Sequence, residues 1–254
     1  MILQDAEIWW SAVLTEDPEY ERFCSRNEQG IYTLRISRKN CDWRMAVGDF
    51  ISYTQMERKN AVLMIGEQEL AEVQEYYQGH TCIDAFFRVD EPCALVHSTP
   101  LENWNQIKQD GCVKSWSILK HEARIQEEKP IGYELGDPAD FQDYVMLGRG
   151  AACEIIVSSR QKGHIVMSPD EQYQSGARLY FDAKRLAEDG LLIRDGAHVK
   201  VKKRLPLRPY LMWVATWENI GLLDRISTPS IFAAMADCEF ERRLKDAVGI
   251  YADY

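Results

Sequence analysis

Leu95-Val96-His97-Ser98-Thr99-Pro100-Leu101-Glu102 is the stretch from which the fold can be worked out. Its apolar first half predicts a short strand over 93–97. Its second half predicts the start of a helix, because Thr99 fits the N-cap, the proline fits the first helical position and the glutamate fits the third, which makes a capping box. His97 and Ser98 are therefore expected at a strand end, directly before a helix N-terminus.

The elements downstream of this stretch are mostly strands. A helix is predicted over 101–110, because apolar residues recur on one face, and Gly111 supplies its left-handed stop. Further strands are predicted over 143–147, 153–157, 163–167, 178–181, 198–201 and 211–217. Asp182 is expected to cap a short helix. The tail from Pro229 is predicted to be a helix with an apolar stripe made of Ile231, Met235, Phe240 and Leu244.

The first ninety residues form a mixed pattern of their own. Strands are predicted over 31–36, 61–65 and 85–89, of which the apolar run 61–65 is expected to be buried. Helices are predicted over 19–27 and 67–79, and a turn that leads into a strand over 47–51. Glu91-Pro92 ends this region. The expected organisation is therefore a mixed α/β module over 1–90, a strand-rich module over 91–226 and a helical tail over 227–254. Packing of the first ninety residues with the rest as one domain stays open.

Composition places the chain among ordinary globular proteins. Its 254 residues are 46% apolar and 28% charged, which excludes a disordered chain, a collagen and a disulfide miniprotein. No window approaches 18 consecutive apolar residues, so we expect no transmembrane helix. The stretch 1–10 contains no Lys or Arg, so we expect no secretory signal. Seven scattered cysteines without a CxxC pair favour reduced thiols in a cytoplasmic protein.

Charge argues against a general nucleic-acid coat. The net charge is −10, and residues 1–90 hold 9 basic and 16 acidic side chains against 21 and 24 in residues 91–254. Non-specific nucleic-acid binding needs many phosphate contacts from Lys and Arg. One basic cluster stands out, and it predicts either a phosphate contact or a solvated strand edge; it consists of Lys200, Lys202, Lys203, Arg204 and Arg208.

Two segments resemble the ADP-ribosyltransferase superfamily. The opening motif of this superfamily is a His, a small residue and a Thr at a strand end, followed by a helix. Residues 95–100, followed by a helix that ends at Asp110-Gly111, resemble this motif. The segment 179–183, followed by a short helix, a strand and Leu205-Pro206-Leu207, is similar to a later part of the RNA 2′-phosphotransferase branch. The resemblance covers about residues 93–215.

The resemblance implies an α+β fold in which an NAD-binding cleft lies between two small antiparallel sheets. It assigns His97 to the ribose next to the nicotinamide, and Ser98 and Thr99 to the nicotinamide site. The chemistry agrees with this assignment. Cleavage of the nicotinamide bond develops positive charge on the ribose, so a fixed pose in a polar pocket matters more than a strong acid or base. A strand-end histidine bonded to backbone remains the alternative for His97.

Four more residues are candidates through the same resemblance. Glu154 is a candidate for the glutamate that orients the acceptor in transferase branches of the superfamily, where it lies late in the sequence. The alternative is a residue of an edge strand that faces solvent. Arg149 and Arg178 are candidates for the arginines that hold phosphates in the RNA branch, since guanidinium binds phosphate bidentately, although neither lies in a motif that aligns with that branch; the alternative is that they are surface residues. Tyr180 is a candidate to stack on the nicotinamide, although an aromatic residue in a strand is more often part of the core.

We expect no metal site. The set made of His80, Cys82, Cys93 and His97 lacks the two tight ligand pairs of structural zinc sites. GxGxxG, P-loop, HExxH and GxSxG motifs are absent, so the sequence gives no support for classical nucleotide folds, zincins or α/β-hydrolases.

The resemblance therefore implies an NAD-binding module that transfers ADP-ribose to a nucleic-acid, protein or phosphate acceptor, with Glu154 or Arg149 acting on the acceptor. The alternative is a non-catalytic interaction module of the same fold that uses the acidic N-terminal surface. An open cleft lined by His97, Tyr180 and Glu154 would favour the enzyme, and their dispersal would favour the interaction module.

Overall fold

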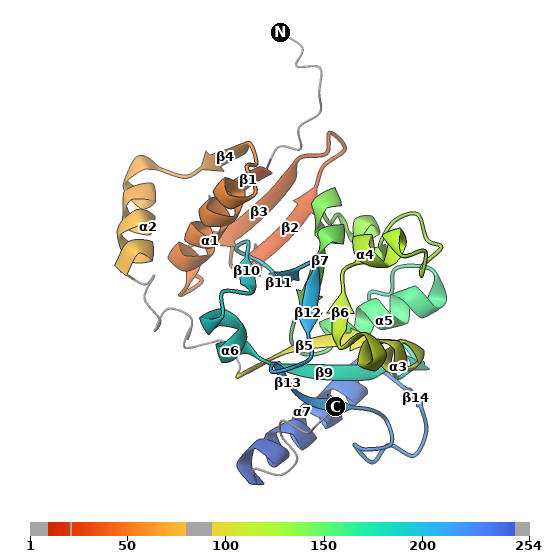
Figure 1. Ribbon diagram of the computed structural model, residues 1–254. Coiled ribbons are helices and arrows are strands. Elements are labelled where there is room, and N and C mark those ends of the chain that lie inside the picture. The colour runs from red at the N-terminus through yellow and green to blue at the C-terminus, as the bar shows by residue number, and fades with distance from the viewer. Residues whose placement is uncertain (1–9, 21, 80–92, 247–254) are drawn as a thin grey trace. The chain divides into compact units, whose positions relative to one another are not determined.

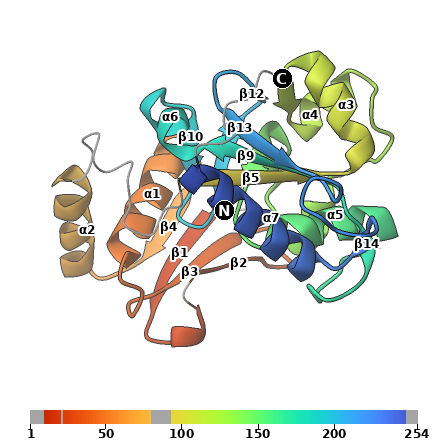
Figure 2. The ribbon, with the colours of Figure 1, turned by 90° about the horizontal axis from the view of Figure 1, so that it is seen from below.

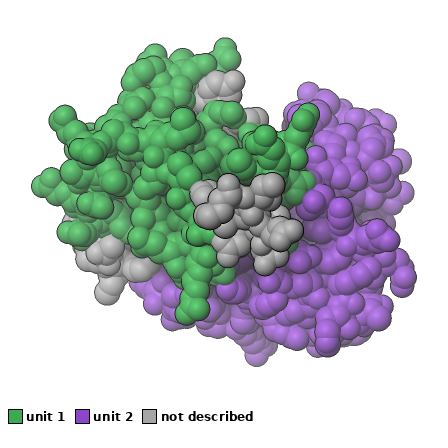
Figure 3. Space-filling model, turned by 90° about the horizontal axis from the view of Figure 1, so that it is seen from above, with its two compact units in different colours: residues 1–89, 135–139, 193–199 green, residues 90–134, 140–192, 200–254 purple. Residues whose placement is uncertain are grey.

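The computed structural model describes residues 10–20, 22–79 and 93–246 (Figure 1). The chain divides into two compact units, coloured separately in Figure 3. Unit 1 holds residues 1–89 together with two later segments, 135–139 and 193–199, and unit 2 holds the rest. No feature of the sequence indicates that these two later segments belong to unit 1. No helix in the described ranges is both long and apolar enough to cross a membrane.

Unit 1 is built on a four-stranded sheet ordered β2-β3-β1-β4. Its strands are β1 (Trp10–Thr15), β2 (Arg22–Arg26), β3 (Tyr32–Ser37) and β4 (Ala61–Met64). β3 and β4 pair with β1 in parallel, whereas β2 pairs with β3 antiparallel. Its helices are η1 (Pro18–Tyr20), α1 (Trp43–Met56) and α2 (Glu67–Gly79). Helix α1 packs on β1 and β3, and α2 packs on α1.

The core of unit 1 lies between the sheet and α1. Trp10 and Tyr32 are paired residues on neighbouring strands, and their rings lie 4.5 Å apart. Phe50 and Tyr53 of α1 close over them, and the rings of Trp10 and Tyr53 are 5.3 Å apart. Aromatic side chains of this size supply most of the apolar burial in a small sheet-and-helix unit.

Three predictions in unit 1 are wrong. The predicted helix over 19–27 is strand β2, because pairing with β3 through a turn at Gly30 outweighs local helix preference. The predicted turn and strand over 47–51 lie inside helix α1. Gly48 marks a close approach there, since a Cβ on it would come within 2.2 Å of the Tyr77 ring on α2. The strand over 61–65 exists as β4, but it is mostly exposed instead of buried.

Unit 2 contains an antiparallel sheet ordered β13-β9-β5 and several smaller pairs of strands. The strands of the main sheet are β5 (Ala94–Thr99), β9 (Ala177–Asp182) and β13 (Leu211–Ala215). The two-stranded sheets are β6 (Cys112–Lys114) with β12 (Arg204–Pro206), and β8 (Tyr173–Gln174) with β14 (Ile226–Ser227). A further sheet is ordered β10-β11-β7, with β7 (Tyr144–Leu147), β10 (Leu192–Arg194) and β11 (Val199–Lys202). The chain passes between the units within β10 and β11.

Two helices cover one face of the main sheet of unit 2. They are α5 (Ala152–Lys162), which packs on β5, and α7 (Pro229–Asp246), which packs on β13 and on α5 (Figure 2). Val96, Tyr180 and Trp213 of the sheet pack there against Phe240 of α7 in one buried cluster. The remaining helices are α3 (Leu101–Asp110), α4 (Trp116–His121), η3 (Ile131–Leu135), η4 (Ala139–Asp143) and α6 (Ala183–Glu188). The fold is α+β with several small sheets, as predicted.

Short-range signals in unit 2 give correct predictions. Helix α3 ends at Gly111, whose φ of 66° is left-handed. The Asp182 carboxylate accepts a hydrogen bond from the Arg185 backbone N–H at 2.9 Å, so Asp182 is the N-cap of α6. The strands over 143–147, 178–181, 198–201 and 211–217 correspond to β7, β9, β11 and β13.

Other predictions in unit 2 are wrong. The apolar run 153–157 is the start of helix α5, and 163–167 forms no strand. A run of five apolar residues does not separate helix from strand, and Gly163, with φ of 70°, is the helix stop. Of the predicted apolar stripe of α7, Phe240 lies in the core and Met235 and Leu244 pack against it, whereas Ile231 is 51% exposed. The residues of α7 that face the core are Phe232, Ala233, Ala236 and Phe240. The strand predicted over 85–89 lies outside the described residues.

Candidate functional site

His97 and Ser98 lie at the C-terminal end of β5 and project to opposite faces of the sheet. β5 pairs antiparallel with β9, so that His97 faces Leu179 and Ser98 faces Arg178 across the ladder. Side chains alternate between faces along a strand. Ser98 and Arg178 therefore share the face that α5 and α7 cover, whereas His97 belongs to the other face.

A carbonyl of β7 fixes the orientation of the His97 ring. β7 reaches β5 through a bridge between Val96 and Gly148, and Nδ1 of His97 then lies 3.1 Å from the Met146 carbonyl oxygen. Burial lowers the pKa of His97, so the ring is neutral near pH 7. A carbonyl only accepts hydrogen bonds, so Nδ1 is the protonated nitrogen and Nε2 is the acceptor. The ring is half-buried.

The predicted capping box at the start of α3 does not form. Helix α3 begins at Leu101, and its N-cap position is Pro100, with no side-chain capping hydrogen bond. Thr99 is 5% exposed, and its hydroxyl accepts a hydrogen bond from the Asn103 side chain at 3.3 Å. Glu102 forms an ion pair with Arg225 at 2.6 Å. The helix start is shifted by one residue because Thr99 completes strand β5.

Glu154 is a buried residue of α5 and not the edge-strand residue that the sequence predicts. It is 0% exposed, and its carboxylate accepts hydrogen bonds from the Ser98 hydroxyl, from the Tyr173 hydroxyl at 2.7 Å and from Nη1 of Arg178 at 3.3 Å. Burial raises the pKa of Glu154, and the positive charge of Arg178 opposes that rise. These donors occupy both oxygens of the carboxylate, so its hydrogen bonds are all made to groups of the protein itself.

Arg178 is the centre of the same network. It is 0% exposed, and it donates to the Gly150 carbonyl at 3.0 Å and to both oxygens of Asp237 at 2.8 and 3.1 Å. Its Nε donates to the Tyr180 hydroxyl at 3.0 Å, and that hydroxyl donates to Asp237 at 2.7 Å. One guanidinium thus links β9, α5 and α7, as a buried charge requires.

Tyr180 is a core residue. Its ring stacks on Phe240 of α7 with centroids 4.2 Å apart, and it is 2% exposed. Arg149 lies on the exposed turn between β7 and α5. The structure therefore brings together four of the predicted site residues, namely Ser98, Glu154, Arg178 and Tyr180. It places His97 and Thr99 on the opposite face and Arg149 at the surface.

Tyr173 and Asp237 complete the network and were not candidates from the sequence. Tyr173 lies on the two-residue strand β8, which no sequence pattern marks. Asp237 lies on the face of α7 toward the sheet, within the predicted tail helix, and it interrupts the apolar surface there. An acidic residue on the inward side of a helix is the one signal that could have been used.

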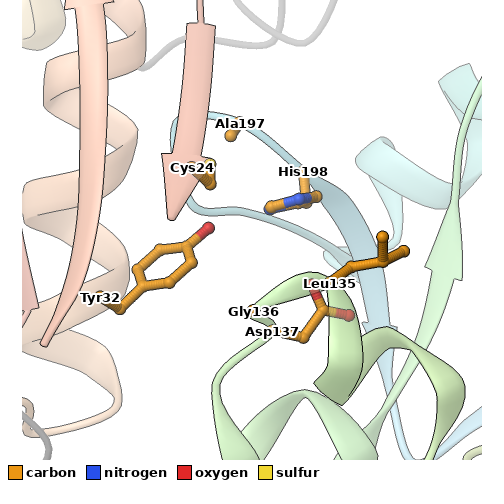
Figure 4. Close-up of a pocket in the computed structure, with 7 residues that line it drawn as sticks. All are labelled: Cys24, Tyr32, Leu135, Gly136, Asp137, Ala197 and His198. Atoms are coloured by element: carbon orange, nitrogen blue, oxygen red, sulfur yellow. The ribbon is translucent and has the colours of Figure 1, made fainter. Parts of the chain in front are cut away.

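A cavity of about 310 Å³ lies within unit 1, and none of the predicted site residues lines it (Figure 4). Its walls come from β2, β3 and both later segments of unit 1, namely Cys24, Tyr32, Leu135, Gly136, Asp137, Ala197 and His198. Within the described ranges, no group of three or more His, Cys, Asp and Glu side chains is placed to hold a metal ion.

No protein-family model, no curated protein and no solved structure matches this chain.

Proposed function

We propose that unit 2 is an ADP-ribosyltransferase-like module that binds NAD beside the junction of β5 and α3. The observation that supports this proposal is the state of His97. Its ring is neutral, half-buried and fixed through Nδ1 to the Met146 carbonyl, so Nε2 is set as a hydrogen-bond acceptor. Among the described residues, none forms a hydrogen bond with that Nε2. A ribose hydroxyl is a donor of the kind that such a nitrogen binds.

The order of elements also supports the proposal. A strand that ends in His97, Ser98 and Thr99 precedes helix α3 and its stop at Gly111, and β9 lies beside that strand as the centre of an antiparallel sheet. This is the order that the resemblance requires. The start of α3 has the positive end of a helix dipole, which favours phosphate or carboxamide oxygens.

In this proposal His97 binds and orients the ribose, and the backbone of Ser98 and Thr99 shapes the nicotinamide side. Bound NAD would supply the chemistry as an ADP-ribosyl group with nicotinamide as its leaving group. The chain's own contribution is a fixed pose, which lowers the entropic part of the barrier. Glu154 and Arg178 act as positioning residues, because Ser98 donates to Glu154 and thereby holds the end of β5.

The test is titration of the full-length protein with NAD at millimolar concentration by calorimetry, with nicotinamide release followed by chromatography. We expect wild-type protein to bind, and His97→Ala to weaken binding at least tenfold. His164→Ala is the matched control, since His164 is exposed and bonded only near its own helix end. No heat with the wild-type protein, or equal binding by His97→Ala, would end the proposal.

A non-catalytic interaction module is the second candidate function. It is favoured by one observation, namely that Glu154, Arg178 and Tyr180 are all engaged in the buried network, on the face of the sheet opposite to His97. Deletion of residues 1–90 is a poor test, because unit 1 also contains 135–139 and 193–199. Charge reversal of exposed glutamates on α2, such as Glu67→Lys with Glu75→Lys, tests the acidic surface and leaves the fold of unit 1 in place.

A further inference from the structure

The cavity of unit 1 gathers a thiol, an imidazole and a phenol from three separate parts of the chain. Cys24 comes from β2, Tyr32 from β3 and His198 from the segment 193–199 (Figure 4). β2 and β3 are antiparallel, and Cys24 faces Leu34, two residues from Tyr32. The thiol and the phenol are therefore diagonal neighbours on one face of the sheet.

The His198 ring is oriented by a buried carboxylate. Nδ1 of His198 lies 3.2 Å from Oδ1 of Asp195, which is 1% exposed. The same oxygen accepts from the backbone N–H groups of Ala197 at 3.1 Å and of His198 at 2.8 Å. A carboxylate beside Nδ1 selects the tautomer in which Nε2 is the basic nitrogen.

The segment that carries His198 is tightly held within unit 1. Gly196 has a φ of 94°, and a Cβ there would lie 2.6 Å from the Ala46 carbonyl oxygen of α1 and 2.6 Å from the Leu34 side chain of β3. Only glycine fits such a backbone conformation and approach. The imidazole is thus presented from a rigid turn and not from a loose loop.

Tyr32 supplies a proton donor at the cavity wall. It is 2% exposed, and burial, then the neighbouring Cys24 thiol and Asp195 carboxylate, raise the pKa of its phenol. The hydroxyl therefore keeps its proton at neutral pH. A fixed donor beside a nucleophile stabilises the negative charge that develops on a carbonyl oxygen during acyl transfer.

We propose that this cavity is a thiol-dependent acyl-transfer site for a small ester or thioester, independent of NAD binding by unit 2. The proposal rests on the grouping of Cys24, His198 and Tyr32 around one cavity, with Asp195 behind the imidazole. A volume of about 310 Å³ is at the lower end of the range for small-molecule sites, so the acyl group must be small.

The reaction has two steps, acylation of Cys24 and hydrolysis of the acyl-enzyme. His198 Nε2 takes the thiol proton, Sγ of Cys24 bonds to the acyl carbon, and the alcohol or thiol leaves with that proton. Water then gives a proton to His198 and its oxygen to the acyl carbon, the C–S bond breaks, and the thiol recovers the proton. The sum is ester or thioester plus water giving acid plus alcohol or thiol.

p-Nitrophenyl acetate is a suitable probe, with p-nitrophenolate release followed by absorbance and the acetylated cysteine located by peptide mass spectrometry. We expect acetylation of Cys24 at least tenfold faster than that of Cys41, which is an exposed cysteine of the same unit. His198→Ala should slow Cys24 acetylation about 10²-fold, as loss of a general base does. Cys41→Ala should leave the rate unchanged.

Two further variants separate chemistry from folding. Tyr32→Phe keeps the ring and should lower the rate of acetylation while leaving the melting temperature within the range of the Cys41→Ala control. Asp195→Asn keeps an oxygen for the two backbone N–H groups but removes the charge, and it should lower the rate without raising the KM for the probe. Acetylation of Cys24 no faster than of Cys41, or an unchanged rate in His198→Ala, would overturn the proposal.

Discussion

Glu154 and Arg178 form an ion pair with a separation of 3.3 Å in which both side chains are 0% exposed. They lie 24 residues apart, on α5 and β9, and Asp237 of α7 gives the guanidinium a second carboxylate. Such a pair holds three elements in one arrangement, because each charge is costly to bury without the other. Glu154, a candidate for acting on the acceptor, and Arg178, a candidate for holding phosphates, therefore form a structural link in unit 2.

Arg178→Ala is expected to destabilise the protein strongly. It would leave Glu154 buried without its positive partner, and removal of one member of a buried pair costs about 3–5 kcal/mol. The measurement is the free energy of unfolding by urea denaturation. Arg160→Ala is the control, since Arg160 is a partly exposed residue of α5 whose ion pair with Glu127 is long at 3.9 Å, and its effect should stay within about 0.5 kcal/mol. Equal losses in the two variants would contradict the structural role.

The burial of His97 predicts a pH dependence of stability. Its folded-state pKa lies below the ordinary value of 6.5, so at pH values under 6.5 the unfolded chain binds the proton more readily than the folded chain. The stability that the neutral ring contributes is therefore fully present above pH 6.5 and is lost as the pH falls toward the folded pKa, with a slope of up to about 1.4 kcal/mol per pH unit.

Urea denaturation between pH 7.5 and 5 measures this dependence, and His97→Gln should remove that part of the slope. The protonation of the ring itself is visible by NMR as a titration shifted to lower pH. A midpoint for His97 at or above 6.5 in the folded protein would be the contrary result.

Gly48→Ala is expected to destabilise unit 1 although alanine favours helices. The added Cβ would lie 2.2 Å from the Tyr77 ring, so the contact between α1 and α2 must shift, at a cost of about 1–3 kcal/mol. In a Tyr77→Ala background the same substitution should instead stabilise α1 by about 0.5–1 kcal/mol, through helix propensity. A double-mutant cycle by thermal denaturation distinguishes the two effects, and additivity of the two substitutions would refute the contact.

Local signals explain why part of this fold can be predicted from the sequence. Gly111 and Asp182 act within one helical turn of the elements that they bound, so α3 and α6 follow from a few neighbouring residues. Helix α1 and strand β2 do not follow in this way. Gly48 is set by a ring on another helix, and β2 by pairing with β3, and neither partner is visible in the local pattern.

The buried network could be predicted only in part from the sequence. Tyr173 and Asp237 were not candidates, whereas Ser98, Glu154, Arg178 and Tyr180, which are four of the candidates, contact one another or a shared carboxylate. The sequence could not show that they face the helices while His97 faces away, since this depends on the register of β5 against β9. Cys24 and His198 lie too far apart along the chain for any motif to connect them.

The composition of unit 1 has a consequence for how this protein is made. Residues 135–139 and 193–199 belong to it as much as its first strands do. A ribosome must therefore have translated past residue 199 of 254 before the N-terminal unit holds all its parts. Nascent chains released before that point should be substrates for chaperones and proteases. Separate expression of residues 1–89 should yield a unit 1 that lacks the segments 135–139 and 193–199.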